Sequence, residues 1–150
     1  MTTLSSIDTN ILLYAANEDC PEQGVCCALL EKATEDPEQW IIADQVYLEL
    51  YRALRNPRVL RKPRKAEEAV AHIRQLRDEL GFLHCGYTVE CWPQLLARLE
   101  VGDFPYQRTH DAVLSGTLLH HGVGTFYTRN TKDFMDAGFS RLINPVDGSC

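Results

Sequence analysis

The 150-residue sequence lacks the features that identify several large classes of protein. No apolar run approaches the roughly 20 residues that a membrane-spanning helix needs, and no basic segment precedes an apolar one near the N-terminus, so we expect neither a membrane anchor nor a signal peptide. No P-loop and no Gly-x-Gly-x-x-Gly motif is present, which leaves binding of ATP or a dinucleotide without support. The net charge of −6 argues against non-specific attraction to nucleic acid or to membranes.

Cysteine is plentiful, but its spacing excludes the common cysteine-based sites. None of the six cysteines belongs to a Cys-x-x-Cys pair, so neither a zinc site nor a thioredoxin-like redox site is predicted. Because no export signal is expected, we predict that these thiols are reduced and mostly buried in a cytoplasmic protein. The six are Cys20, Cys26, Cys27, Cys85, Cys91 and Cys150.

Short apolar runs alternate along the chain with longer segments of helical periodicity. This alternation predicts one α/β domain over residues 1–150, in which helices cover both faces of a central parallel sheet of about four to five strands, a three-layer α/β/α architecture. We expect Asp44 and Thr109 to cap two of the helices. The expected strands are 3–7, 40–43, 82–85, 125–128 and the edge strand 141–143; the expected helices begin after Asp8 and then cover 22–35, 44–56, 63–80, 88–100 and 110–121, with a helical turn at 131–137.

Four acidic residues stand where this fold would bring them together. Asp8 directly follows the first expected strand and Asp133 lies a few residues after the fourth, so both should sit beyond the carboxyl ends of the strands, where ligands bind in such folds. Glu49 and Asp111 lie on helical segments. Ionised carboxylates repel one another and are costly to bury, so a cluster of them is usually held by a bound cation. The alternative is four unrelated surface acids, some of them favoured by helix dipoles.

The four acids form an all-oxygen set of candidate ligands. Carboxylates without neighbouring thiolates or a histidine cluster favour Mg²⁺, or Mn²⁺, over zinc. Such ions bind phosphates, orient a water molecule and offset the charge of a leaving oxygen, so hydrolysis of a phosphodiester is the reaction that these residues would support. Polar residues beside the acids offer hydrogen bonds that would orient the carboxylates or hold a metal-bound water. They are Thr9, Asn10, Thr128 and Asn130.

Three segments of the chain resemble one known family. They are SSIDTNILLYA, the glutamate-bearing YLELYRALRNPRV, and THDAVLSGTLLHHGVGTFYTRNTKDF, whose ending T-x-N-x-x-D-F is the most specific part. In this order, and over nearly the whole chain, they resemble the PIN-domain ribonucleases and especially the VapC toxins.

The resemblance implies a compact α/β sandwich, an Mg²⁺-dependent endoribonuclease acting on RNA, and a toxin restrained by a cognate antitoxin. Thr128 and Asn130 match family positions near the metal, and the fourth acid contributes less uniformly across the family than the other three. We also expect a homodimer, for which Tyr47 and Tyr51 on one helical face offer a surface. The catalytic and metal-binding residues implied by the resemblance are Asp8, Glu49, Asp111 and Asp133.

Basic residues are concentrated in one stretch. Between Arg52 and Lys65 there are seven basic residues and no acidic one, nearly half of the 15 lysines and arginines of the chain. Such a stretch would contact RNA phosphates and steer the substrate despite the overall negative charge. A solvated connector between two helices, or a docking surface for the antitoxin, are the alternatives. The candidate RNA-binding residues are Arg52, Arg55, Arg58 and Arg61.

Other interpretations of the same residues fit the sequence less well. His110 and Asp111 match the His-Asp pair of the HD phosphohydrolases, but that family is all-helical and uses further histidine ligands. A haloacid-dehalogenase-like site would need an aspartate where Asn10 stands. The alternative from a different class is a PIN-like module that binds RNA or protein without cleaving, and its RNA binding would be unaffected by removing metal. We expect Trp40 and Trp92 to serve packing rather than base stacking.

Overall fold

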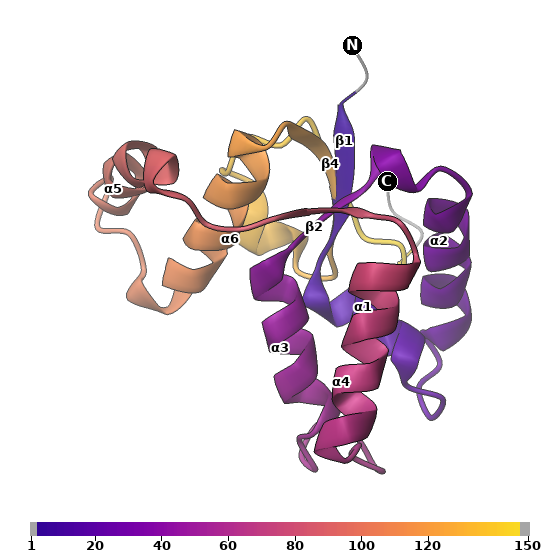
Figure 1. Cartoon of the computed structure of the whole chain (residues 1–150). Helices are drawn as coiled ribbons and strands as arrows, with labels where there is room; N and C mark the ends of the chain where they lie inside the picture. Colours follow the sequence, from indigo (N-terminus) through magenta and orange to yellow (C-terminus); the bar gives the residue numbers. More distant parts are fainter. Residues whose placement is uncertain (1–2, 148–150) are drawn as a thin grey trace.

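Five strands, each parallel to its neighbours, run through the centre of the computed structural model, which describes residues 3–147 (Figure 1). They are β1 (Leu4–Ile7), β2 (Ile41–Ala43), β3 (Leu83–Cys85), β4 (Val123–Tyr127) and β5 (Arg141–Ile143). One sheet has the order β1-β4-β5, and β2 pairs with β3 in another. A parallel bridge between Ser5 and Trp40 joins them, so the strands follow the order β3-β2-β1-β4-β5. The expected parallel sheet is confirmed.

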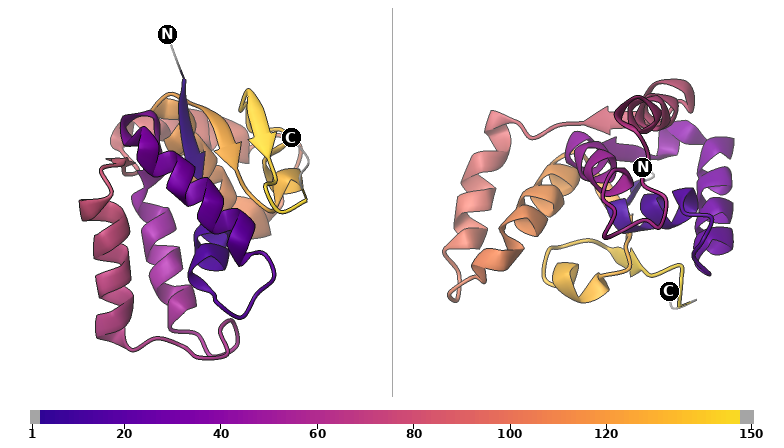
Figure 2. Two further views of the ribbon diagram at one scale, coloured as in Figure 1. Left: turned by 90° about the vertical axis from the view of Figure 1, so that its right-hand side faces the viewer. Right: turned by 90° about the horizontal axis from the view of Figure 1, so that it is seen from below.

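Helices cover the strands on two sides. In the view from below, α5 and α6 lie on one side of the strands and α1 and α2 on the other, which is the expected α/β/α layering (Figure 2, right). The helices α3 and α4 pack side by side as a pair that extends away from the strands (Figures 1 and 2). The helices are α1 (Thr9–Ala16), α2 (Gln23–Glu35), α3 (Asp44–Leu54), α4 (Ala66–Arg74), α5 (Trp92–Leu99) and α6 (Thr109–His120), with the shorter η1 (Pro37–Gln39), η2 (Gln75–Glu79), η3 (Val89–Cys91), η4 (Tyr106–Arg108) and η5 (Thr131–Phe134).

Apolar side chains of the strands and helices form one continuous core. Ile7 of β1 and Phe126 of β4 are fully buried in it. The ring of Phe126 meets Phe134 edge-on and stacks on Phe139, with ring centroids 5.0 and 5.1 Å apart. Such aromatic pairs add to the stabilisation from burial alone. They anchor the segment after β4, which carries Asp133, to the centre of the core.

Two helices start differently from the prediction. Asp44 is the first residue of α3, and Ala43 before it has the extended backbone of a cap. The side chain of Asp44 pairs instead with Arg77 at 3.4 Å. Thr109 is likewise the first residue of α6, and its hydroxyl donates to the carbonyl oxygen of Tyr106 at 2.6 Å. Both capping predictions were wrong, because a cap requires an extended residue whose side chain is free to accept.

The helix expected at 63–80 starts later and ends in a wider turn. The carboxylate of Glu68 accepts from the backbone N–H of Lys65, which fixes the start of α4 at Ala66. The chain continues as the π-helical turn η2, and Gly81 ends it with a φ of +86°, which favours glycine. Within residues 3–147, every helix is too short or too polar to cross a membrane.

The burial of cysteine and tryptophan follows the prediction only in part. The cysteines described by the structure are free thiols, three of them buried, and Cys150 lies outside the described residues. Trp40 is buried in the core, as expected. Trp92 is 48% exposed, and its ring packs edge-on against that of Tyr87.

Candidate active site

Asp8 leaves β1 at the carboxyl edge of the sheet and is held there by both of its carboxylate oxygens. Its backbone N–H donates to the carbonyl oxygen of Tyr127 at the end of β4, at 2.9 Å. The N–H of Thr9 donates to Oδ1 at 2.8 Å, and the hydroxyl of Thr128 donates to Oδ2 at 2.7 Å. Thr128 in turn accepts from the N–H of Asn130 at 3.1 Å. The carboxylate of Asp8 is therefore both buried and fixed in direction.

Glu49 lies on α3, and two neighbours hold its carboxylate. The hydroxyl of Thr9 donates to Oε2 at 2.8 Å, and Nε2 of Gln45 donates to Oε1 at 3.1 Å. The same amide nitrogen of Gln45 donates to the carbonyl oxygen of His110 at 3.1 Å. Gln45 thus ties α3 to the first turn of α6, next to Asp111. Gln45 was not among the residues predicted from the sequence, although its position four residues before Glu49 on a helix is a usable signal.

Asp111 and Asp133 are brought together by an arginine that the sequence analysis also missed. Asp111 lies in the first turn of α6, and Asp133 lies in η5. The guanidinium of Arg108 donates to the carbonyl oxygen of Asp133 and to Oδ1 of Asp136. Its charge also lies close enough to Asp111 to oppose the rise in the pKa of that carboxyl. Arg108 therefore connects the start of α6 to η5.

A second arginine also contacts Asp136, which is not one of the four predicted acids. Arg98 of α5 donates to Oδ1 of Asp136 at 3.1 Å. The guanidinium groups of Arg98 and Arg108 both lie over the ring of Phe104, at 5.7 and 5.5 Å from its centroid. Cation–π contacts of this kind stabilise a partly desolvated cation. Arg98 and Arg108 thus connect α5 and the start of α6 to η5 and to Asp136, which follows it.

The four predicted acids influence one another electrostatically. Burial raises the pKa of Asp8 to about 6, opposed by its hydrogen bonds from Thr128 and Thr9 and assisted by the charges of Glu49 and Asp111. Burial also raises the pKa of Asp111, with the charges of Asp133 and Glu49 adding to it. The interactions therefore link all four carboxylates in one region, with Asp133 reached through Asp111.

The spacing of the acids is wider than that of a closed metal site. Among residues 3–147, no three side chains of aspartate, glutamate, histidine or cysteine are arranged to ligate one ion directly. The donor set nevertheless fits a hard cation, because it is entirely oxygen and includes a buried carboxylate whose charge is disfavoured without a partner. Mg²⁺ commonly keeps several of its waters, so carboxylates can reach it through them. Asp8, Glu49 and Asp111 are the residues that would hold it.

Asn10 acts on the backbone rather than on an acid. Its Oδ1 accepts from the N–H of Arg129 at 3.2 Å and so supports the turn after β4. The side chain of Arg129 donates to the hydroxyl of Tyr14 at 3.1 Å and pairs with Glu22 at 3.6 Å. These contacts connect α1 and α2 to the segment that contains Thr128. Asn10 therefore shapes the surroundings of Asp8 indirectly.

The predicted basic stretch lies only partly near the acids. Arg52 lines a groove of about 590 Å³ that also has Glu49 in its wall. Arg55, Arg58 and Arg61 are exposed beyond it, where the chain leaves α3 at the end away from the strands (Figure 1). Arg64 has a structural contact, because it donates to the carbonyl oxygen of Ala16 at 3.2 Å.

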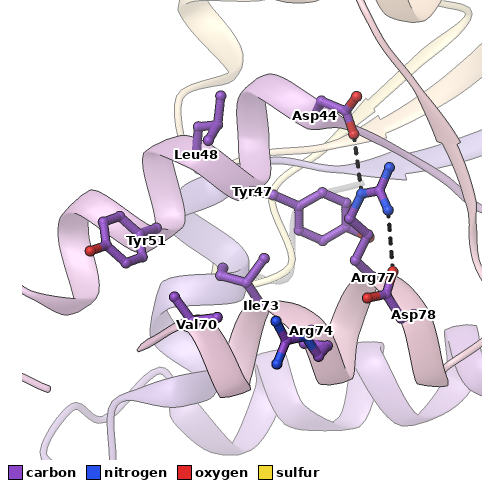
Figure 3. A pocket seen from close by; sticks show the side chains of 9 residues that line it. All are labelled: Asp44, Tyr47, Leu48, Tyr51, Val70, Ile73, Arg74, Arg77 and Asp78. Atoms are coloured by element: carbon purple, nitrogen blue, oxygen red, sulfur yellow. Dashed lines mark hydrogen bonds and ion pairs between the residues drawn. The ribbon is translucent and has the colours of Figure 1, made fainter. Parts of the chain in front are cut away.

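A second groove, of about 490 Å³, separates α3 from α4 (Figure 3). Leu48 and Tyr51 face it from α3, and Val70 and Ile73 face it from α4 (Figure 3). At one end, Arg77 pairs with acids on both of its sides (Figure 3). This groove shares Asp44 and Leu48 with the groove beside Glu49 and contains none of the four predicted acids.

Comparison with known proteins decides the family. A model of the PIN domain matches residues 6–139. The chain is a PIN-domain protein. Its sequence is 36% identical over 149 residues to Ribonuclease VapC24 of Mycobacterium tuberculosis. The aligned region covers 94% of this chain and 96% of that protein.

Solved structures show the same fold at lower sequence identity. The PIN domain described here resembles Mycobacterium tuberculosis VapC20, a toxin that cleaves the sarcin–ricin loop, with a TM-score of 0.67, 22% identity, and 90% of this chain and 95% of that chain covered. It also resembles VapBC2 from Rickettsia felis, solved with a promoter DNA fragment, with a TM-score of 0.65, 18% identity, and 94% and 98% of the two chains covered. A toxin–antitoxin complex from Klebsiella pneumoniae matches with a TM-score of 0.59, 19% identity, and 94% and 97% covered.

Proposed function

We propose that this PIN domain is an Mg²⁺-dependent endoribonuclease and the toxin of a toxin–antitoxin pair. The observation that carries the proposal is the electrostatic linkage of Asp8, Glu49, Asp111 and Asp133, with the pKa of the buried Asp8 raised to about 6. Such a set of carboxylates is expensive to keep charged unless a cation offsets it. The likeness to Ribonuclease VapC24 over 94% of the chain supports RNA as the substrate.

The chain's own residues would divide the work in a specific way. A bound Mg²⁺, or Mn²⁺ in its place, supplies charge stabilisation on the phosphodiester and lowers the pKa of a nearby water. Asp8, Glu49 and Asp111 would hold the ion, and Asp133 would complete the acidic ring. Thr9 and Gln45 keep both oxygens of Glu49 in a fixed direction. Fixed ligands matter because a misplaced carboxylate would misplace the scissile phosphate.

Proton transfer would fall to a carboxylate of the same group. A base accepts a proton most effectively when its pKa lies near the working pH. In the metal-free chain, burial and neighbouring negative charge raise the pKa values of Asp8 and Asp111, and a bound cation would oppose that rise, so accessibility decides between them. Of the two, Asp111 is the more accessible, since the carboxylate of Asp8 is buried and already accepts from Thr9 and Thr128. We assign the role of proton acceptor from the attacking water to Asp111.

An antitoxin partner and a homodimer belong to the same proposal. Support for the antitoxin comes from the structural relatives, which include the VapBC2 complex and the Klebsiella pneumoniae toxin–antitoxin complex. Tyr47, expected on a dimer surface, is buried, so the exposed Leu48 on α3 and Leu96 on α5, at 71% and 53%, are the apolar positions proposed for these interfaces. The alternative function, a binding module without activity, uses the same fold but predicts no cleavage.

The deciding experiment is incubation of purified protein with structured RNAs, either in Mg²⁺ or in chelator. The proposal predicts internal cleavage in Mg²⁺ only, with products mapped by end-labelling, and none with Asp111→Asn. RNA binding that survives chelation, together with intact RNA in Mg²⁺, would establish the binding module instead.

A further inference from the structure

The groove beside Glu49 contains features that the catalytic acids do not require. Its walls come from α3, from the start of α6 and from the segment that follows β3. Because β3 is parallel to β2, and the bridge between Ser5 and Trp40 is also parallel, this segment leaves at the same edge as Asp8. The volume of about 590 Å³ lies in the range of small-ligand sites. Glu49 makes the groove continuous with the acidic site.

An aromatic side chain lines this groove. Tyr87, two residues after β3, lines it and is 37% exposed. Trp92 contacts the tyrosine ring edge-on, with centroids 5.6 Å apart and planes at 71°. In a T-shaped pair the edge of one ring meets a face of the other, so the contact holds the Tyr87 ring in place and leaves at least one of its faces available for stacking. Two large aromatic side chains in solvent contact are not accounted for by the core, which contains neither of them.

One arginine lines the same groove, together with the acids Asp44 and Glu49. Arg52 comes from α3, and exposed His110 comes from the start of α6. Arginine binds phosphate through several N–H groups at once. The groove therefore combines a cation for a phosphate, an aromatic ring for a base and a border on the acidic site. Single-stranded RNA is recognised by this combination, because its unpaired bases are free to stack on aromatic side chains.

We infer that Tyr87, supported by Trp92, forms a stacking subsite for one unpaired base of an RNA substrate, next to the nucleotide whose phosphate reaches the acids. The inference rests on the proposed function, since it takes RNA as the ligand. Arg52 contacts the phosphate of the stacked nucleotide. The subsite selects unpaired RNA over helical RNA, because a base inside a duplex cannot reach the ring. It places cleavage within or beside a loop.

The test measures stacking and affinity separately from cleavage. Short single-stranded RNAs carry 2-aminopurine at successive positions, and their fluorescence is followed on binding to Asp111→Asn protein in Mg²⁺, which leaves the RNA intact. We expect strong quenching at one position. Adding Tyr87→Leu should abolish that quenching and weaken binding about 5- to 150-fold, the loss typical of one stacked base. Tyr87→Phe keeps the ring and should retain both signals.

Two further variants separate stacking from general effects. Tyr106→Leu removes a tyrosine that is 81% exposed on η4 and does not line the groove, so it should leave the quenching unchanged. Trp92→Leu removes only the edge contact and should reduce the quenching in part. Thermal melting of each variant verifies that it is folded before its RNA binding is measured, and Trp92→Leu replaces Tyr87→Leu as the test if the latter does not fold.

The outcomes distinguish this inference from the proposed function. If wild-type protein cleaves RNA in Mg²⁺ while Tyr87→Leu keeps wild-type quenching and affinity, the subsite is wrong and the nuclease stands. If Tyr87→Leu weakens binding of the antitoxin but not of RNA, the groove belongs to the protein partner and the inference is overturned. If wild-type protein neither binds nor cleaves RNA, the proposed function fails first, and the subsite fails with it.

Discussion

The hydroxyl of Thr9 donates a 2.8 Å hydrogen bond to Oε2 of Glu49, which lies 40 residues further along the chain. The backbone N–H of the same threonine donates to Oδ1 of Asp8. One residue at the start of α1 therefore orients two of the predicted ligands, one through its backbone and one through its side chain. This arrangement makes the geometry of the two carboxylates interdependent, so we expect substitutions at either acid to have similar consequences.

Removing any one of three acids should abolish most of the activity. We expect Asp8→Asn, Glu49→Gln and Asp111→Asn each to lower kcat/KM for RNA by at least ~100-fold, because metal placement depends on few ligands. Asp133→Asn should have a milder effect. Steady-state cleavage assays measure this, and Glu31→Gln, an exposed change on α2, serves as the control. Near-normal cleavage by one of the three variants would remove that residue from the site.

Relative to Asp8→Asn, the metal-free wild-type protein should become less stable as pH rises through about 6. Burial raises the pKa of Asp8 from 3.8 to about 6, so the folded state binds this proton more tightly than the unfolded state. The protonated carboxyl of Asp8 therefore stabilises the fold fully below pH 3.8, and this contribution is lost as pH rises through about 6. A shift of about two pKa units corresponds to about 3 kcal/mol. In chelator, the free energy of unfolding of wild type, relative to Asp8→Asn, should therefore fall between pH 4 and pH 7.

The comparison with Asp8→Asn removes an opposing effect. Burial, assisted by the charge of Arg64, lowers the pKa of His72 from 6.5 to about 4, so this histidine costs stability as pH falls below 6.5. His72 is present in both proteins and cancels in the difference. A difference that does not change with pH would mean that Asp8 ionises normally in the folded chain.

Mg²⁺ should stabilise wild-type protein far more than Asp111→Asn. In chelator at pH 7.5 the variant should be the more stable of the two, because burial and the charges of Asp133 and Glu49 raise the pKa of Asp111. Added Mg²⁺ should then raise the melting temperature of wild type. The gain in its free energy of unfolding is up to ~2.7 kcal/mol at 100 times the dissociation constant. Melting curves at increasing Mg²⁺ concentration test this. Equal responses in the two proteins would show that Asp111 is not a ligand.

The two arginines that share Asp136 should differ in their effect on activity. Both donate to Asp136 and lie against Phe104, but only Arg108 also donates to the carbonyl oxygen of Asp133. We expect Arg108→Gln to lower kcat about 10-fold, the effect typical of a residue that orients a ligand. Arg98→Gln should lose comparable stability in thermal melts while keeping activity close to wild type. Equal losses of activity would mean that the hairpin contributes only to folding.

The basic stretch should contribute to RNA affinity through charge alone. Reversing the charge of Arg55, Arg58 and Arg61 should weaken binding and flatten its dependence on salt, by about 0.7 in the logarithmic slope for each lost phosphate contact. Binding isotherms at several salt concentrations measure the slope. The matched control reverses Lys32, Arg74 and Arg141, which are exposed elsewhere. An unchanged slope would assign the stretch to another partner, with the antitoxin first.

The sequence predicted the order of the elements well and their ends less well. Strand β5 occupies the expected residues 141–143, because a short apolar run is a local signal. The capping residues of α3 and α6 were each misplaced by one position, since the caps are Ala43 and Arg108 rather than the nearby polar residues. A side chain already engaged elsewhere, as Asp44 is with Arg77, cannot cap a helix.

The sequence predicted the parts of the candidate site that residue type and position in the chain mark, and not those that depend on long-range contacts. The acids stand out because carboxylates beside strand ends are unusual, and their catalytic roles stay predictions. Gln45 and Arg108 were missed because their contacts, with His110 and with Asp133, join residues 65 and 25 positions apart. No local pattern marks such a pair. The exposure of Trp92 was missed for a related reason, since periodicity places a residue on a helix face but does not say what covers that face.

The bridge between Ser5 and Trp40 has a mechanical consequence for the acids. Within residues 3–147 it is the isolated β-bridge that joins the two sheets. The hydroxyl of Ser6 adds a second link by donating to the carbonyl oxygen of Ile41. Asp8 belongs to the sheet on one side of this seam, and Glu49 follows the strand on the other side. A cation bound by both carboxylates would therefore link the two sheets across this boundary. Loading the site would then add a link across this boundary to the one that the hydroxyl of Thr9 already makes with Glu49, so metal binding should stiffen the contact between the two sheets.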